Sequence, residues 1–316
     1  MADLQARVAG LSLRNPFLLA SGIWGESGTS LAGAWSAGAG GVITKSIGRE
    51  PRPGYPNPTV ESLGPWGFLN AMGLPNPGIR EYPREIAAAL AAGTTVIGSV
   101  FGHDALEYAD LAEAMARTGV AALELNLSCP HAEGLGSEIG QDPAEVERVT
   151  RAVCERVRVP VIVKITPNVA DPVALGRAAE RAGAAAVSAI NTVRALAIDV
   201  RMRRPVLSHG LGGLSGPAIK PIGLACVWQL YPALSIPIVG VGGIRTAEDA
   251  LEYVMAGASA VEVGTAIAFE GIGLFGRLVE GLGKLLDELG FASLGDAVGA
   301  AHPAERGPPV ADPPGG

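Results

Sequence analysis

The chain has 316 residues, of which 48% are hydrophobic and 17% charged, and its 24 basic and 31 acidic side chains give a net charge of −7. This composition excludes disordered and fibrous proteins, and an acidic chain without a run of Lys or Arg is unsuited to nucleic-acid binding. Three cysteines cannot form a disulfide framework and the N-terminal residues lack an apolar signal core, so we expect a cytoplasmic protein. Prolines and glycines interrupt the longest uncharged stretch, residues 221–244, so we expect no membrane span.

Short runs rich in β-branched residues recur along the chain, each bounded by Gly, Pro or a polar residue. Most are continuously apolar rather than alternating, which is typical of strands covered on both faces of a parallel sheet. The eight predicted strands are Phe17–Ala20, Gly41–Lys45, Thr94–Val100, Ala121–Leu127, Pro160–Ile165, Ala184–Ile190, Ile236–Val241 and Ala260–Val263.

Helical patterns separate these strands, and the clearest follows Asp142. Asp142 is the predicted N-cap, Pro143 takes the first helical position, and Glu145 completes a capping box. Repeated alternation of strand and helix predicts an α/β protein, a closed (β/α)8 TIM barrel, with a doubly wound open sheet as the alternative. The apolar stripe of that helix is Val146, Val149, Val153 and Val157, and other helices are predicted to start at Asp171–Pro172, Ser215–Gly216–Pro217 and Thr246.

Two connections are longer than a barrel requires, residues 47–78 and 191–215. The first is rich in Pro and Gly, which predicts an irregular but structured loop over one end of the barrel. Long loops after barrel strands lie at the C-terminal face, where active sites of this fold are built. We expect residues 1–298 to form one domain and residues 299–316, which cannot bury apolar surface, to form a disordered tail.

Polar residues and glycines stand at the C-terminal ends of the predicted strands and should converge on one rim. Lys45 and Lys164 each end an apolar strand, where an unpaired ammonium is costly to desolvate, so both need an anionic partner. That partner is either a core carboxylate or a ligand, and we expect a ligand because the strands supply few acids nearby. The strand ends carry Ser21, Lys45, Ser99, Asn126, Lys164, Asn191, Gly242–Gly243 and Gly264–Thr265.

The glycines after the last two predicted strands, Gly242–Gly243 and Gly264, lie where barrels present backbone N–H groups to a phosphate. Each motif alone is only a turn, but the pair at these two strands favours a ligand that carries a phosphoryl group. The chain has no P-loop motif, so a P-loop nucleotidase is not supported.

Cys129 follows the fourth predicted strand and places a thiol just above the rim. Such a thiol can act as a base or nucleophile where its surroundings favour the thiolate, or it can be an inert rim residue. Cys154 and Cys226 lie within helical patterns and are expected to pack as small hydrophobic residues. The spacing of His, Cys and acidic residues predicts no metal site.

Several separated motifs together resemble class 1 dihydroorotate dehydrogenases, the flavin enzymes of pyrimidine synthesis, and most closely subclass B. The resemblance covers roughly residues 4–289. The motifs are Ala20–Gly22, Thr44–Lys45, Leu69–Leu74 with Asn76–Gly78, Asn126–Pro130, Lys164 with Thr166–Asn168, Asn191–Thr192, Gly212–Pro217, Gly242–Gly243 and Gly264–Thr265.

The resemblance implies oxidation of dihydroorotate to orotate with FMN as cofactor. Cys129 would remove the C5 proton while the C6 hydride passes to the flavin, and Lys164 would face the flavin edge that becomes negative on reduction. FMN would be held by Ser21, Lys45, Ser46, Asn126, Lys164, Ile190, Gly216, Gly242, Gly243, Gly264 and Thr265. The substrate would be held by Lys45, Asn70, Ala71, Met72, Gly73, Leu74, Asn126, Asn191 and Thr192.

Some residues depart from this family pattern. Ser99 stands where we expect an Asn near the flavin. Asn126–His131, followed by Gly140–Pro143, also looks like the pyrimidine-reducing domain of dihydropyrimidine dehydrogenase, which makes reduction of uracil or thymine the main alternative. Alternatives from other classes are a flavin-free, phosphate-binding barrel lyase or isomerase, and a binding subunit that has lost its chemistry.

Subclass B enzymes pair with a second chain that carries FAD and a two-iron two-sulfur cluster and passes electrons to NAD. This chain has neither the cysteines for such a cluster nor a dinucleotide-binding loop, so NAD reactivity would require that partner, in a heterotetramer. The alternative is a homodimer that works alone with fumarate or a quinone as acceptor.

Overall fold

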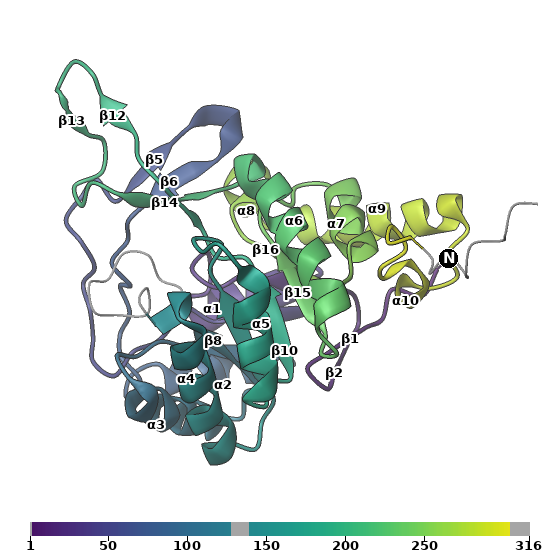
Figure 1. Ribbon diagram of the computed structural model, residues 1–316, viewed down its shortest axis with the longest axis horizontal. Coiled ribbons are helices and arrows are strands. Elements are labelled where there is room, and N and C mark those ends of the chain that lie inside the picture. Colours follow the sequence, from purple (N-terminus) through teal and green to yellow (C-terminus); the bar gives the residue numbers. More distant parts are fainter. Residues whose placement is uncertain (1, 128–138, 304–316) are drawn as a thin grey trace, which may run out of the picture.

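The computed structural model describes residues 2–127 and 139–303, and its centre is a closed barrel of eight parallel strands (Figure 1). The strands follow one another around the barrel in chain order, and β16 pairs with β3 to close it. The predicted (β/α)8 barrel is confirmed, and the open sheet is excluded. The barrel strands are β3 (Phe17–Leu19), β4 (Gly41–Ile43), β7 (Val96–Val100), β8 (Ala122–Asn126), β9 (Val161–Ile165), β10 (Ala186–Ala189), β15 (Ile238–Val241) and β16 (Ala258–Val263).

Helices surround the barrel and cover the outer faces of its strands, so the strands are buried on both sides (Figure 1). This explains their continuously apolar sequences. The helices are α1 (Gly28–Ser36), α2 (Pro83–Ala91), α3 (Ala105–Ala116), α4 (Pro143–Arg156), α5 (Pro172–Arg181), α6 (Lys220–Leu230), α7 (Ala247–Met255), α8 (Ala266–Glu270), α9 (Leu274–Leu289) and α10 (Leu294–Ala297).

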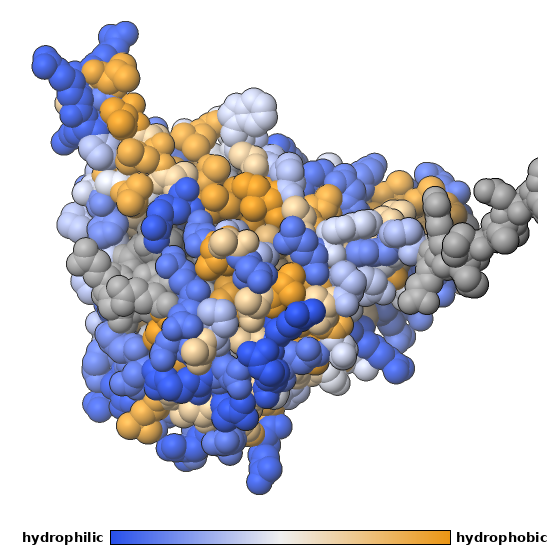
Figure 2. Space-filling view, viewed as in Figure 1, coloured by the Kyte–Doolittle hydropathy of each residue, from blue (hydrophilic) through white to orange (hydrophobic). Residues whose placement is uncertain are grey.

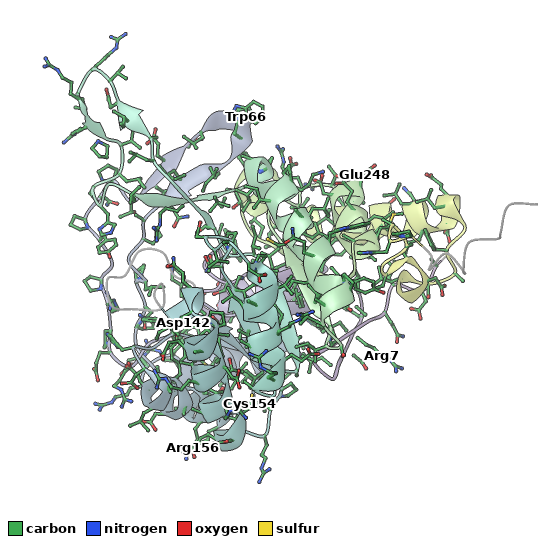
Figure 3. All side chains as sticks on the ribbon, in the orientation of Figure 1. Arg7, Trp66, Asp142, Cys154, Arg156 and Glu248 are labelled. Atoms are coloured by element: carbon green, nitrogen blue, oxygen red, sulfur yellow. The ribbon has the colours of Figure 1, made fainter. Side chains whose placement is uncertain are left out.

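Helix α4 begins after Asp142 as predicted, and Figure 3 shows Asp142 and Arg156 at its two ends. The Asp142 side chain accepts a hydrogen bond from the backbone N–H of Ala144. The predicted capping box is wrong, because Glu145 pairs instead with Arg148 one turn along the helix. Helix α7 does have a capping box, formed by Thr246 and Asp249.

The two long connections form a second sheet that the sequence did not predict. Its four antiparallel strands are ordered β11-β14-β6-β5 and lie over the carboxyl ends of the barrel strands, and we call it the roof sheet (Figure 1). The expectation of an irregular loop at residues 47–78 is therefore wrong in part, because these residues pair with strands from the other connection. The strands are β5 (Val60–Ser62), β6 (Phe68–Asn70), β11 (Val193–Ala195) and β14 (Gly212–Ser215).

Two strands of the roof sheet, β6 and β14, pack closely at a glycine. Gly67 has a φ of +135°, and a Cβ there would lie 1.8 Å from the carbonyl oxygen of Ser215, so only glycine permits this approach. On the far side, the rings of Tyr55 and His209 stack at 4.1 Å and join the two connections. The local sequence predicts neither of these two contacts.

A two-stranded hairpin, β12 (Ile198–Asp199) and β13 (Arg204–Pro205), projects from this end of the molecule (Figure 1). Val200 is 80% exposed and Met202 61% exposed. Figure 2 shows hydrophilic residues at its tip and hydrophobic residues beside them.

Both ends of the described chain pack on the barrel. A short hairpin, β1 (Ala6–Val8) and β2 (Leu11–Leu13), precedes the first barrel strand. Residues 299–302, placed in the predicted tail, bond to α7 through Gly299 and Ala301, and the His302 ring stacks on Trp228 at 3.7 Å. The packed part of the chain therefore extends past the expected boundary.

Within the described residues, no helix combines the length and apolar character that a bilayer crossing requires.

Candidate functional site

A cavity of about 450 Å³ lies between the carboxyl ends of the barrel strands and the roof sheet. Every residue that the family resemblance assigned to FMN lines it, although these residues come from eight separate segments of the chain. They are Ser21, Lys45, Ser46, Asn126, Lys164, Ile190, Gly216, Gly242, Gly243, Gly264 and Thr265.

The residues assigned to the substrate reach the same cavity with one exception. Asn70, Met72, Gly73, Leu74, Asn191 and Thr192 line it together with Lys45 and Asn126. Ala71 does not: it is fully buried in a small apolar cluster with Leu69 and Leu207 behind the roof sheet. In an extended segment successive side chains point to opposite sides, so Ala71 points away from the cavity that its neighbours Asn70 and Met72 line.

Hydrogen bonds among the strand ends hold the polar residues on one side of the cavity. The Ser46 hydroxyl lies 3.2 Å from that of Ser21 and 2.9 Å from that of Ser99, and it accepts a bond from Nδ2 of Asn126 at 3.0 Å. Asn191 Nδ2 donates to Asn126 Oδ1 at 3.3 Å. Ser99, which departs from the family pattern, is fully buried and does not line the cavity. Its hydroxyl instead supports that of Ser46, which does line the cavity.

Lys45 forms an ion pair with Glu26, from Nζ to Oε1 at 3.0 Å. The Lys45 side chain is 8% exposed, whereas that of Glu26 is 72% exposed. Such a partner is largely screened by water and binds weakly, so an anionic ligand in the cavity can replace it.

Lys164 has core carboxylates as partners, which corrects the expectation that the strands supply few acids. Its Nζ lies 2.5 Å from Glu262 Oε2 and 3.6 Å from Glu124 Oε2, and both acids are buried. Burial lowers the pKa of Lys164, but attraction to the two acids outweighs it and the net pKa is raised, so the ammonium stays charged. The signal was present: each acid interrupts an apolar strand, as Leu-Glu-Leu and Val-Glu-Val.

The glycine loops after β15 and β16 come close to the loop that follows β14. Gly243 has a φ of +72°, and a Cβ there would lie 2.8 Å from the carbonyl oxygen of Gly216. Thr265 Oγ1 donates to Ser215 Oγ at 2.9 Å. This close packing brings backbone groups of the glycine loops to the end of the cavity where a barrel cofactor site is expected to hold a phosphate.

The predicted base, Cys129, lies outside the described residues, as does His131. Asn126, three residues before Cys129 in the sequence, lines the cavity. Of the other cysteines, Cys154 is half-buried and Cys226 buried, and burial raises the pKa of each thiol to about 11. Neither thiol is suited to act as a base near neutral pH.

A model of the dihydroorotate dehydrogenase family matches residues 3–286. Curated relatives named dihydroorotate dehydrogenase B (NAD(+)), catalytic subunit, match nearly the whole chain. That of Pyrococcus furiosus is 50% identical over 300 residues, covering 95% of this chain and 99% of the relative. That of Pyrococcus abyssi is 48% identical, and the match covers 94% of this chain and 99% of the relative. That of Methanocaldococcus jannaschii is 47% identical, and the match covers 95% of this chain and 98% of the relative.

Fold, cavity and comparisons define the class of the protein as a flavin-dependent oxidoreductase built on a TIM barrel. The chain belongs to the dihydroorotate dehydrogenase family, and its resemblance to subclass B is confirmed. The expected activity, oxidation of dihydroorotate in pyrimidine biosynthesis, is confirmed at the level of the family. The matches favour it over pyrimidine reduction and over a flavin-free barrel enzyme.

Proposed function

We propose that this chain is an FMN-containing catalytic subunit that oxidises dihydroorotate to orotate within the cavity beneath the roof sheet. One observation carries the proposal: residues assigned to cofactor and substrate from distant motifs surround one cavity at the carboxyl ends of the barrel strands. Active sites of barrel enzymes lie at this end.

The cavity fits FMN by the chemistry of its lining. At one end, Gly216, Gly242 and Gly243 line the cavity and offer backbone groups to a phosphate. At the barrel axis, Lys164 supplies a buried cation, and Asn126 supplies hydrogen-bonding groups. FMN, when bound, supplies the acceptor for the hydride that leaves C6 of the substrate.

The substrate is bound by groups from the barrel and from the roof sheet. Lys45 exchanges its exposed partner Glu26 for the substrate carboxylate, while the amides of Asn126 and Asn191 bind the pyrimidine ring. Asn70, whose Nδ2 donates to the carbonyl of Gly213 at 3.2 Å, binds from above and helps to exclude water. Cys129 accepts the C5 proton as general base.

Lys164 stabilises negative charge that develops beside it, because its ammonium is buried and already positioned. A fixed cation in a site of low dielectric acts more strongly than one in water, since no solvent must reorganise. The bonds to Glu124 and Glu262 limit the movement of its side chain.

Electrons leave through a partner chain in this proposal. The relatives are named as catalytic subunits of an NAD(+) enzyme, which supports the existence of a second subunit. In this proposal the second subunit carries FAD and a two-iron two-sulfur cluster. The complex is a cytoplasmic heterotetramer built on a homodimer of this chain. Exposed apolar residues of the β12–β13 hairpin support a protein interface on that side. Full activity of the lone chain with fumarate or a quinone would favour the one-subunit alternative.

The test is an anaerobic titration of the purified chain, loaded with FMN, while the flavin absorption is recorded. Dihydroorotate should bleach the flavin and dihydrouracil should not. Bleaching by dihydrouracil alone would favour the dihydropyrimidine dehydrogenase alternative. A chain that binds no FMN would contradict the flavin assignment and revive the barrel lyase or isomerase.

A further inference from the structure

Two carboxylic acids meet in the centre of the barrel beneath the cavity. Glu124 comes from β8 and Glu262 from β16, strands on opposite sides of the barrel, and their exposed fractions are 0% and 2%. Both contact Lys164, and Ser188 Oγ of β10 donates to Glu124 Oε2 at 3.2 Å. Glu124, Glu262 and Lys164 all line the cavity, so the acids lie directly beneath the proposed flavin. We call Glu124 and Glu262 the acid pair.

The charges of this cluster balance only if the acid pair holds one proton. Two ionised acids and one ammonium carry a net charge of −1, which is costly at this depth. Oε1 of each acid has no hydrogen-bond partner among the described residues, so nothing else compensates a second negative charge. Burial and the neighbouring Glu124 raise the pKa of Glu262 to about 8, against the attraction of Lys164. Because the two acids interact closely, the proton belongs to the pair rather than to either residue.

Other ionisable groups are kept away from the acid pair by the packing around it. Among the described residues, the remaining barrel strands β3, β4, β7, β10 and β15 carry no ionisable side chain. Outside the barrel, α7 and β1 pack on β16, and α3 packs on β8. Asp249 and Glu252 of α7 pair with Lys220, and Glu248 is exposed. The acids of α3 pair with Arg49 and Arg117, and Arg7 of β1 is exposed. Lys164 is therefore the charged group that faces the acid pair.

We propose that Glu124 and Glu262 act as positioning residues that share one proton, and that reduction of the flavin makes the pair hold this proton more tightly. The inference rests on the proposed function, because it requires a flavin beside Lys164. Negative charge that arrives there adds to the cost of ionising the second acid. At a pH where the acid pair of the oxidised enzyme has lost the shared proton, reduction of the flavin makes the pair bind a proton again.

The proton and electron count is balanced. Dihydroorotate loses a proton from C5 to the base and a hydride from C6 to the flavin. The ionised acid pair gains one proton from solvent when the flavin is reduced, and it returns that proton when the electrons pass to NAD through the partner chain. The pair consumes nothing over a full cycle.

The test is the midpoint potential of the bound FMN as a function of pH in the wild type, Glu262→Gln and Glu124→Gln. A glutamine resembles the protonated acid and leaves the other acid to neutralise Lys164. Both variants should therefore fold, and near pH 7 the midpoint potential of their FMN should match that of the wild type. Above about pH 8, the wild type should show an extra slope of about 30 mV per pH unit, the value for one proton per two electrons, and both variants should lack it. Thr150→Val, a buried change on α4, should keep the extra slope.

A second measurement uses an indicator dye during reduction by dihydroorotate at about pH 9. The wild type should take up as much as one proton more per flavin than Glu262→Gln. Equal slopes and equal proton counts in wild type and variants, with the flavin reduced by dihydroorotate, would overturn this inference alone. A chain that takes up no flavin, or that dihydroorotate does not reduce, would overturn the proposed function as well.

Discussion

The floor and the roof of the cavity are built in different ways. The floor, formed by Lys164 and the acid pair, belongs to barrel strands whose parallel ladders fix each residue in register. The roof sheet pairs two connections that are far apart in the chain, and Ser215 of this sheet accepts a hydrogen bond from Thr265, which follows the barrel strand β16. The floor therefore contains buried ionisable groups, while the roof depends on pairing between distant segments. We infer that the floor controls flavin chemistry, while the roof contributes to substrate binding together with residues of the barrel rim.

The largest expected effect comes from breaking the floor. Lys164→Met leaves two buried acids without their cation, and the free energy of unfolding should fall by about 3–5 kcal/mol, with weaker FMN binding. Chemical denaturation and flavin titration measure both. Lys284→Met, an exposed lysine paired with Glu280, should leave the free energy of unfolding nearly unchanged. An unchanged stability of Lys164→Met would show that the three groups are not coupled.

Cys129→Ser tests chemistry that neither floor nor roof supplies. The variant should bind FMN normally, but its flavin should be reduced by dihydroorotate roughly hundreds of times more slowly, the scale of a lost general base. Stopped-flow absorbance measures the rate, with Cys154→Ser, on helix α4, as the control (Figure 3). A wild-type rate would remove Cys129 from the mechanism.

Asn70→Ala tests the roof. Loss of an amide that binds substrate should raise KM for dihydroorotate about tenfold, equivalent to about 1.4 kcal/mol, and leave FMN binding unchanged. Steady-state kinetics and flavin titration separate these effects. Glu61→Gln, exposed on β5 of the same sheet, should behave as the wild type. Loss of FMN in Asn70→Ala would show that the roof also holds the flavin.

The acid pair should make the stability of the floor depend on pH. Because the pKa of Glu262 is raised from 4.5 to about 8, the folded chain keeps a proton that the unfolded chain has lost across this range. Stability contributed by this group should therefore fall as pH rises from about 5 to 8 and then level off. Denaturation of Glu262→Gln should show a smaller slope. Glu248→Gln, which is exposed, should retain the wild-type slope.

The smallest effect concerns the rim between floor and roof. Glu26→Gln removes the exposed partner of Lys45, so the substrate carboxylate no longer competes with it. KM for dihydroorotate should fall by less than about fivefold, as expected for a screened surface ion pair. A rise in KM would mean that Glu26 positions Lys45 rather than competing for it.

Much of the barrel could be predicted because its signals are local. The apolar runs marked all eight strands, and the residues that follow them lie at the predicted rim. The position of the glycine loops after the last two strands was also readable, and motif resemblance added Asn70. The predicted capping box at Glu145 failed for a local reason: a nearby arginine offered a stronger partner than the helix end.

The sequence by itself determined the fold class, the end of the barrel that carries the site, and most of the residues that line the cavity. Only the tertiary structure decided that Glu124 and Glu262 meet at Lys164, that Ser99 supports Ser46, and that two connections pair as the roof sheet. The physical reason is that local hydrophobic patterns specify each strand separately. Contacts across a barrel depend on register and closure, which bring together side chains that no local pattern relates.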